Sequence, residues 1–139
     1  MKLALVTDLH ANRDAVEAVM AHSVAQGAQR YVFLGDFVGY GAEPAWVVDF
    51  VIDQVNQGAV AVMGNHDSAV VKGPTPTMVP QAREVVDWTH GQLDDRQLGF
   101  LAQLPMRKTV LVRGVQAETV ATEGVEARGC GWGGVALIH

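Results

Sequence analysis

The chain has 139 residues, 49% of them hydrophobic, which is enough for one domain with a buried core and excludes a disordered chain. Its net charge is −5 at pH 7 and it has no run of Lys or Arg, so we expect no general nucleic-acid binding. No apolar run is long enough to span a membrane, and the single cysteine excludes an intrachain disulfide and a cysteine-cluster metal site. We therefore expect a cytoplasmic protein that does not bind membranes.

Strands and helices alternate in the first half of the sequence. Three short apolar runs, KLALVT (2–7), RYVFLG (30–35) and AVAVM (59–63), predict strands that are covered on both faces. Apolar residues at helical spacing lie between them and predict two helices, the first capped by Asn12 and the second beginning near Pro44. This alternation predicts an α/β fold, in which flanking helices cover a layered sheet through right-handed crossovers.

The second half is less regular. Pro80 predicts the start of another helix, Asp94 can cap a further one, and residues 107–113 are interpreted as a strand. Residues 114–134 carry many glycines and show neither the strand nor the helix period, so we expect irregular or poorly ordered chain there. The apolar run before the last residue predicts a further strand over 135–139.

Polar side chains follow each of the three predicted parallel strands. Asp8 and His10 follow the first strand, Asp36 follows the second, and the run Asn65–Asp67 follows the third. Because ligand sites in open α/β sheets form beyond the carboxyl ends of the strands, we expect these groups to meet. Turn chemistry would explain one such end more readily than all three. In an extended segment residues i and i+2 point the same way, so Asp8 and His10 can reach one ion.

The ligand types indicate which metals would suit the site. Carboxylate and amide oxygens with imidazole nitrogens, and no thiolate, favour Mn, Fe, Zn or Mg. Three sequence blocks, in this order and spacing, resemble the calcineurin-like metallophosphoesterase superfamily: DLHAN (8–12), GDFVGYG (35–41) and GNHD (64–67). Two more stretches resemble its bacterial phosphodiesterase-like branch: GYGAEPAWVVDFV (39–51) and REVVDWT (83–89). The resemblance covers roughly residues 1–109, and residues 1–113 are assigned to the N-terminal part of such a domain.

The resemblance implies a site with two divalent metal ions. It implies that Asp8 and His10 bind the first metal, that Asp36 bridges both, and that Asn65 binds the second. The family continues into a second half with a further strand-end histidine and a Gly-His-x-His element, which this chain lacks. We interpret His139 as that first histidine, although residues 110–139 could also be foreign to the family, as after a frameshift.

The resemblance also implies a reaction and two catalytic roles. A metal-bridging hydroxide would attack the phosphorus of a phosphodiester or phosphomonoester. His66 would face the phosphate and the leaving group without binding metal, and Asp67 would orient His66.

Two other readings remain open beside a truncated metal-dependent phosphoesterase. The chain could be an inactive fragment that binds a single metal weakly. It could also be a flavodoxin-like nucleotide-binding module, which has the same alternation of elements but lacks these ligands. A truncated sheet would expose an edge, so self-association through that edge is expected.

Overall fold

The computed structural model of the chain describes residues 1–112, 115–120 and 134–138. The strands are β1 (Leu3–Thr7), β2 (Arg30–Phe33), β3 (Val60–Ala61), β4 (Arg107–Val112), β5 (Val115–Val120) and β6 (Gly134–Ile138). The helices are α1 (Arg13–Ala25), α2 (Pro44–Asn56), α3 (Asn65–Lys72), α4 (Pro80–Gln92) and α5 (Asp95–Gln103). Among these helices none has the length and apolar composition that crossing a bilayer requires.

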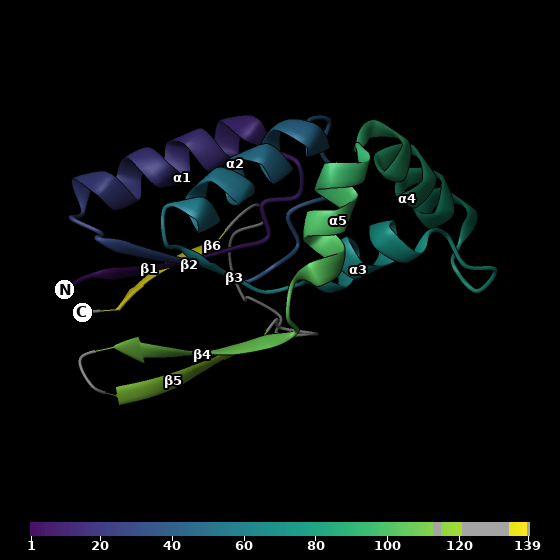
Figure 1. The fold of residues 1–139 in the computed structure, drawn as a ribbon. Helices are drawn as coiled ribbons and strands as arrows, with labels where there is room; N and C mark the ends of the chain where they lie inside the picture. The colour runs from purple at the N-terminus through teal and green to yellow at the C-terminus, as the bar shows by residue number, and fades with distance from the viewer. Residues whose placement is uncertain (113–114, 121–133, 139) are drawn as a thin grey trace.

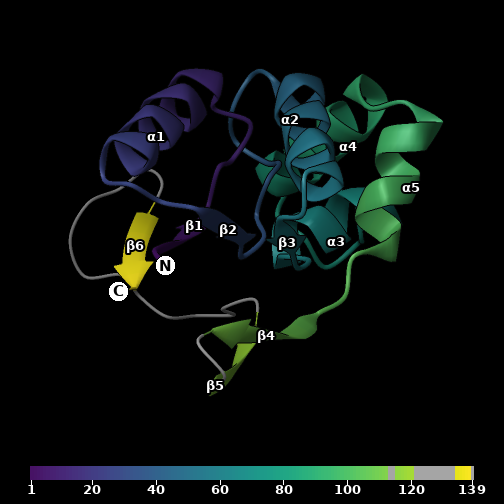
Figure 2. The same cartoon turned by 60° about the vertical axis from the view of Figure 1, so that its left-hand side comes forward.

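The main sheet has the strand order β3-β2-β1-β6. β1, β2 and β3 run parallel, with Leu3 opposite Arg30, whereas β6 runs antiparallel to β1 and places Ile138 opposite Leu3. Figures 1 and 2 show α1 and α2 over one face of this sheet, with α3, α4 and α5 gathered beyond the ends of the strands. The predicted α/β class with a parallel sheet is confirmed, and the carboxyl ends of all three parallel strands share one edge.

Four of the five helices in the described residues begin where the sequence predicts. The side chain of Asn12 accepts a hydrogen bond of 3.0 Å from the amide of Ala15, which caps α1. Pro44 and Pro80 are the first residues of α2 and α4, where a missing amide hydrogen has no helical partner to lose. Asp94 caps α5 by accepting a hydrogen bond of 2.7 Å from the amide of Gln97.

The core lies between the sheet and the covering helices. Val47, Val48 and Val51 form the inner stripe of α2 and have no exposed surface. They belong to one apolar cluster with Phe33 of β2 and Phe37, which immediately follows the turn after β2. On the other face of the sheet a small cluster joins Leu3 and Val32 to Val110 of β4. The turn that carries Asp36 is therefore anchored in the core by the residue that follows it, Phe37.

One helix is not predicted from the sequence, and one local prediction is wrong. The sequence predicts no helix directly after the third strand, but Asn65 begins α3, in which the Asp67 side chain bonds back to the Gly64 amide and the helix continues to Lys72. Irregular chain was expected throughout 114–134, but Val115–Val120 forms β5, which pairs antiparallel with β4. Each residue of β5 has a partner in β4. The segment is therefore a strand because of the hydrogen bonds of this pairing, which the spacing of its apolar residues does not indicate.

Of the remaining predictions for the last part of the chain, one has a counterpart in the structure and the others concern residues outside the described ones. The strand expected over 135–139 corresponds to β6. Residues 121–133 and His139 lie outside the described residues.

Candidate metal centre

Three side chains capable of binding a metal converge at the carboxyl edge of the sheet. Asp8 and His10 follow β1 and Asp36 follows β2. Each offers a ligand atom, and these atoms all lie within 4.8 Å of one another. The structure thus brings together the three residues that the sequence placed at the ends of the first two strands.

The backbone that carries these residues is not extended. Asp8, His10 and Asp36 have φ angles of 58°, 44° and 55°, in the left-handed region. The expectation that Asp8 and His10 converge because they lie two apart in an extended segment is therefore wrong. Asp and His adopt this conformation more readily than most residues, which is the signal that the sequence offered.

Backbone hydrogen bonds between the two loops fix the convergence instead. The amide of His10 donates to the carbonyl of Asp36 over 2.9 Å, and the amide of Ala11 donates to the carbonyl of Phe37 over 2.7 Å. The amide of Asp8 donates to the carbonyl of Gly35 over 3.2 Å. The loop after β1 thus lies along the loop after β2 as an irregular continuation of their pairing.

The imidazole of His10 has the partners expected of a metal ligand. Its Nδ1 lies 3.2 Å from the carbonyl oxygen of Val38, which can only accept, so Nδ1 carries a proton. Its Nε2 lies 3.3 Å from Oδ1 of Asp8. Two lone pairs at this separation repel unless a proton or a cation lies between them. A histidine that donates one N–H to a carbonyl and presents its other nitrogen beside a carboxylate fits a divalent cation.

Asp67 is fully buried and binds backbone rather than His66. Its Oδ2 accepts hydrogen bonds from the amides of Asp36 (2.8 Å) and Gly64 (2.9 Å). Its Oδ1 accepts from the amides of Phe37 (2.8 Å) and Val38 (3.2 Å). The expectation that Asp67 orients His66 is therefore wrong, because both oxygens are already engaged by four amides. Asp67 instead holds the loop that carries Asp36 against the start of α3.

Opposing influences act on the charge of Asp67. The pKa of Asp67 is raised to about 7: burial is the largest influence and the Asp36 carboxylate raises the pKa further, whereas the hydrogen bonds from the Gly64, Val38 and Phe37 amides lower it. A proton on either oxygen would replace one of the four amide hydrogen bonds. The geometry of the amides therefore suits the ionised carboxylate.

Glycines allow the close approach of the two loops. A Cβ added to Gly64 would overlap the amide nitrogen and Oδ1 of Asp36. A Cβ added to Gly35, which has a φ of 93°, would overlap the amide nitrogen of Gly64. Any side chain at either position would push Asp36 away from Asp67.

His66 lies beside the three converging side chains. Its amide donates a hydrogen bond of 2.9 Å to Oδ1 of Asp36, and its ring centroid is 4.9 Å from that of His10. Burial, the largest influence, lowers the pKa of the His66 imidazole, while the carboxylates of Asp36 and Asp8 raise it. Asn65 precedes it at the first position of α3.

Tyr40 is a residue of this site that the sequence analysis missed. Its ring centroid lies 4.9 Å from His10 and 4.8 Å from His66, and its φ is 64°. The side chain is 66% exposed, so the ring is presented to solvent above the two imidazoles. The signal available in the sequence was an aromatic residue between two glycines, Gly39 and Gly41, directly after Asp36 and its loop.

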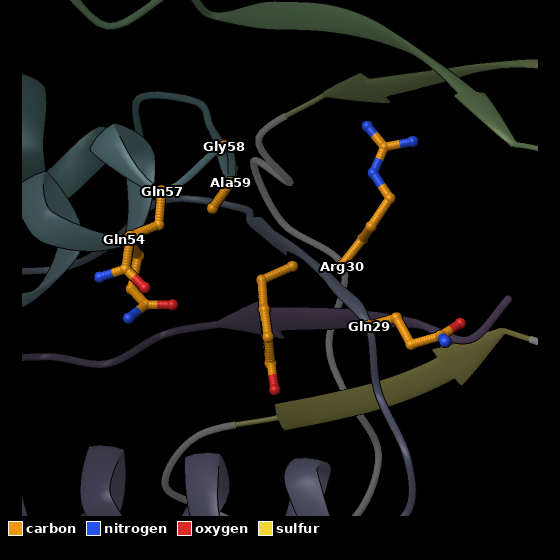
Figure 3. A pocket seen from close by; sticks show the side chains of 7 residues that line it. Gln29, Arg30, Gln54, Gln57, Gly58 and Ala59 are labelled. Carbon is orange, nitrogen blue, oxygen red and sulfur yellow. The ribbon is translucent and has the colours of Figure 1, made fainter.

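A separate polar cavity of about 320 Å³ lies at the opposite, amino end of β2 and β3. Figure 3 shows Gln29, Arg30, Gln54 and Gln57 around it. Because the candidate ligands follow the carboxyl ends of the strands, this cavity is no part of the candidate metal centre.

Comparison with known proteins shows the family to which the chain belongs. The family model described as calcineurin-like phosphoesterase matches residues 1–124. An uncharacterized protein of Methanocaldococcus jannaschii is 31% identical over 105 residues, which is 75% of this chain and 42% of that protein. The crystal structure of a metallophosphoesterase from Sphaerobacter thermophilus is similar with a TM-score of 0.65 and 35% identity, over 78% of this chain and 43% of that one.

A hypothetical protein from Pyrococcus horikoshii shares the fold, with a TM-score of 0.69 and 15% identity, over 84% of this chain and 53% of that one. The chain thus spans less than half the length of the M. jannaschii and S. thermophilus relatives. With the family model matching most of its residues, the chain belongs to the calcineurin-like phosphoesterase family.

Proposed function

We propose that this chain forms the metal-binding part of a dinuclear phosphoesterase that hydrolyses phosphodiesters or phosphomonoesters. The observation that carries the proposal is the convergence of Asp8, His10 and Asp36 within 4.8 Å at the strand ends of a chain that belongs to this family. The match covers only 42% of the M. jannaschii relative, so the activity of such longer proteins does not come with family membership, and hydrolysis by this chain needs its own test.

The proposed ligands divide between two ions. Asp8 and His10 would hold the first, Asp36 would contact both, and Asn65 would hold the second. His139, outside the described residues, is proposed as a further ligand. Bound Mn, Fe, Zn or Mg ions would supply positive charge for the phosphoryl oxygens and would activate water.

His66 is the proposed proton donor at the leaving oxygen. Its imidazole lies against His10 and Tyr40, and its amide is bonded to Asp36, so the ring stays next to the ligands without having to bind metal. Lowering of its pKa by burial favours release of a proton to the substrate. The Asp36 carboxylate opposes this lowering of the His66 pKa. As a bridging ligand, Asp36 would have its negative charge balanced by the metal ions and would oppose the lowering less.

A weaker alternative is a module that binds one metal and has no activity. It is favoured by one observation: within the described ranges, the His, Cys, Asp and Glu side chains form a single converging group of three. Metal stoichiometry separates the two proposals. The flavodoxin-like alternative is rejected, because the chain belongs to the calcineurin-like phosphoesterase family.

The test compares Asp36→Asn with Asp53→Asn, a matched loss of an exposed carboxylate on α2. In Mn²⁺, elemental analysis of the wild-type chain should give two ions per chain, and Asp36→Asn should weaken binding at both positions by roughly 100-fold or more. Hydrolysis of bis-p-nitrophenyl phosphate should depend on metal in the wild type and in Asp53→Asn.

Equal metal content in the wild type and Asp36→Asn would contradict the bridging role. One ion per chain and no metal-dependent hydrolysis would favour the single-metal alternative.

A further inference from the structure

A hollow of about 320 Å³ lies between α3 and α4, directly beside the candidate metal centre. Asn65, His66 and Tyr40 line its inner end. His66 is connected to the proposed ligands through the hydrogen bond of 2.9 Å from its amide to Oδ1 of Asp36. A phosphate ester bound at the metal centre would therefore have this hollow, the α3–α4 pocket, next to its leaving group or its second substituent.

The outer part of the pocket is apolar. Its walls there are formed by Ala69, Met78, Ala82, Val85 and Val86. Gln81 supplies one amide, and none of the described residues that line the pocket is Lys, Arg, Asp or Glu. A second phosphate group or a free sugar would lose its water here without gaining charge or enough hydrogen bonds in return. An apolar group would lose little and would bury surface.

The size of the pocket suits an aromatic ring. An apolar cavity of about 150 Å³ is large enough to bind benzene, and this pocket has about twice that volume. The ring of Tyr40 stands at the inner end, where a second planar group could pack against its face or edge.

The pocket is built on fixed elements. The ring nitrogen Nδ1 of His90, on α4, lies 2.8 Å from the carbonyl oxygen of Val70, on α3, and donates a hydrogen bond to it. Val70 and Val86 are both buried where the two helices meet. Because α3 and α4 are joined in this way, little conformational freedom would be lost when a ligand binds between them.

We propose that the α3–α4 pocket receives the apolar substituent of the substrate, so that the preferred substrates are phosphate esters of aromatic or similarly planar apolar alcohols. This inference rests on the proposed phosphoesterase function. The phosphoryl group binds at the metal centre, and the substituent lies between Tyr40 and the apolar residues of α4.

The test compares two non-hydrolysable probes, phenylphosphonate and methylphosphonate, by calorimetric titration of the full chain in Mn²⁺. Both carry the same charged head, and they differ only in the group that the pocket would receive. Phenylphosphonate should bind on the order of ten-fold more tightly. Ala82→Phe, which fills the pocket, should remove this preference and leave methylphosphonate affinity unchanged.

Ala102→Phe is the matched control, because Ala102 is exposed on α5 and does not line the pocket. It should keep the full preference. Val85→Thr, which preserves shape and adds a hydroxyl, should reduce the preference by about three-fold and serves if Ala82→Phe fails to fold.

Equal affinities for the two phosphonates in the wild type would overturn the pocket assignment while leaving the metal centre intact. Loss of preference in Ala102→Phe as well as Ala82→Phe would also overturn it. If neither phosphonate binds, the proposed function fails and this inference fails with it.

Discussion

Both ends of the parallel sheet have turns with left-handed backbone, but different residues occupy them. At the amino end the chain enters β2 and β3 through Gly27 and Gly58, whose φ angles are 78° and 101°. A Cβ at either glycine would meet nothing within 4 Å, so these are ordinary turns in open space. Glycine adopts such angles without steric cost.

At the carboxyl end, four of the residues with left-handed backbone carry polar or aromatic side chains of the candidate site. Asp8, His10, Asp36 and Tyr40 all have positive φ, at a cost of roughly 1–3 kcal/mol each. Such strain persists only where surrounding contacts over-determine the conformation. Here those contacts are the amide hydrogen bonds to Asp67 and the backbone bonds between the two loops. The comparison teaches that side chains with left-handed backbone at the carboxyl edge are held by partners distant in the sequence, whereas at the amino edge the left-handed positions are glycines in local turns.

The largest effect on folding stability is expected when the charge of Asp67 at the carboxyl end is removed. Asp67→Asn replaces one acceptor oxygen with an NH₂ group, which would face two of the amides that now donate to the carboxylate. Two buried amides left without acceptors should lower the free energy of unfolding by about 4 kcal/mol. Urea denaturation measures this, with the exposed Asp53→Asn as the control. A loss below about 1 kcal/mol would mean that the four amides find other acceptors.

A methyl group added to a glycine should distinguish the two ends directly. Gly64→Ala would drive a Cβ into Asp36 and should cost about 3 kcal/mol of folding stability. Gly58→Ala has open space and should cost only the strain of its φ angle, about 1–2 kcal/mol. Denaturation of both variants under the same conditions tests the difference. Equal losses would show that the crowding at Gly64 is relieved by a small backbone shift.

The hydroxyl of Thr7 should have a smaller effect that appears in metal binding. Thr7 donates a hydrogen bond of 2.7 Å to Oδ2 of Asp8 and so directs that carboxylate. Thr7→Val keeps the shape of the side chain and should weaken Mn²⁺ binding about ten-fold, or about 1.4 kcal/mol. Calorimetric titration of Mn²⁺ measures the change. Unaltered affinity would mean that Asp8 is oriented by its left-handed backbone alone.

The smallest effect on metal binding is expected at His66. His66→Asn retains the amide that bonds to Asp36 and removes only the ring. Metal affinity should change by less than about two-fold, because the proposed ligands are Asp8, His10, Asp36 and Asn65. The same titration decides the matter: loss of an ion from this variant would make His66 a ligand.

The fold could be predicted largely because its signals are local. Asn12, Pro44, Pro80 and Asp94 each act within one helical turn, so their positions in the sequence reveal where helices begin. The strand at Val115–Val120 could not be predicted in this way, because it depends on pairing with β4. Its sequence, VQAETV, has too weak an alternation to indicate a strand alone.

The candidate site could be predicted as a set of residues but not as a geometry. The sequence places Asp8, His10 and Asp36 at strand ends, and parallel strands end at one edge. The backbone angles of these residues and the partners of Asp67 depend on contacts between positions about 30 residues apart. No local pattern carries that information, and the expectation that Asp67 orients His66 came from the family resemblance alone.

The hydrogen bonds of Asp67 also make the candidate metal centre depend on a segment that follows its first three ligands in the chain. Residues 36–38 are held in place by a carboxylate 29 to 31 positions further along the chain. During synthesis, a nascent chain that has exposed only β1, α1 and β2 already contains Asp8, His10 and Asp36, but lacks the group that fixes the last of them. The final arrangement of Asp36 therefore requires the first turn of α3, although Asp36 itself lies in the loop after β2.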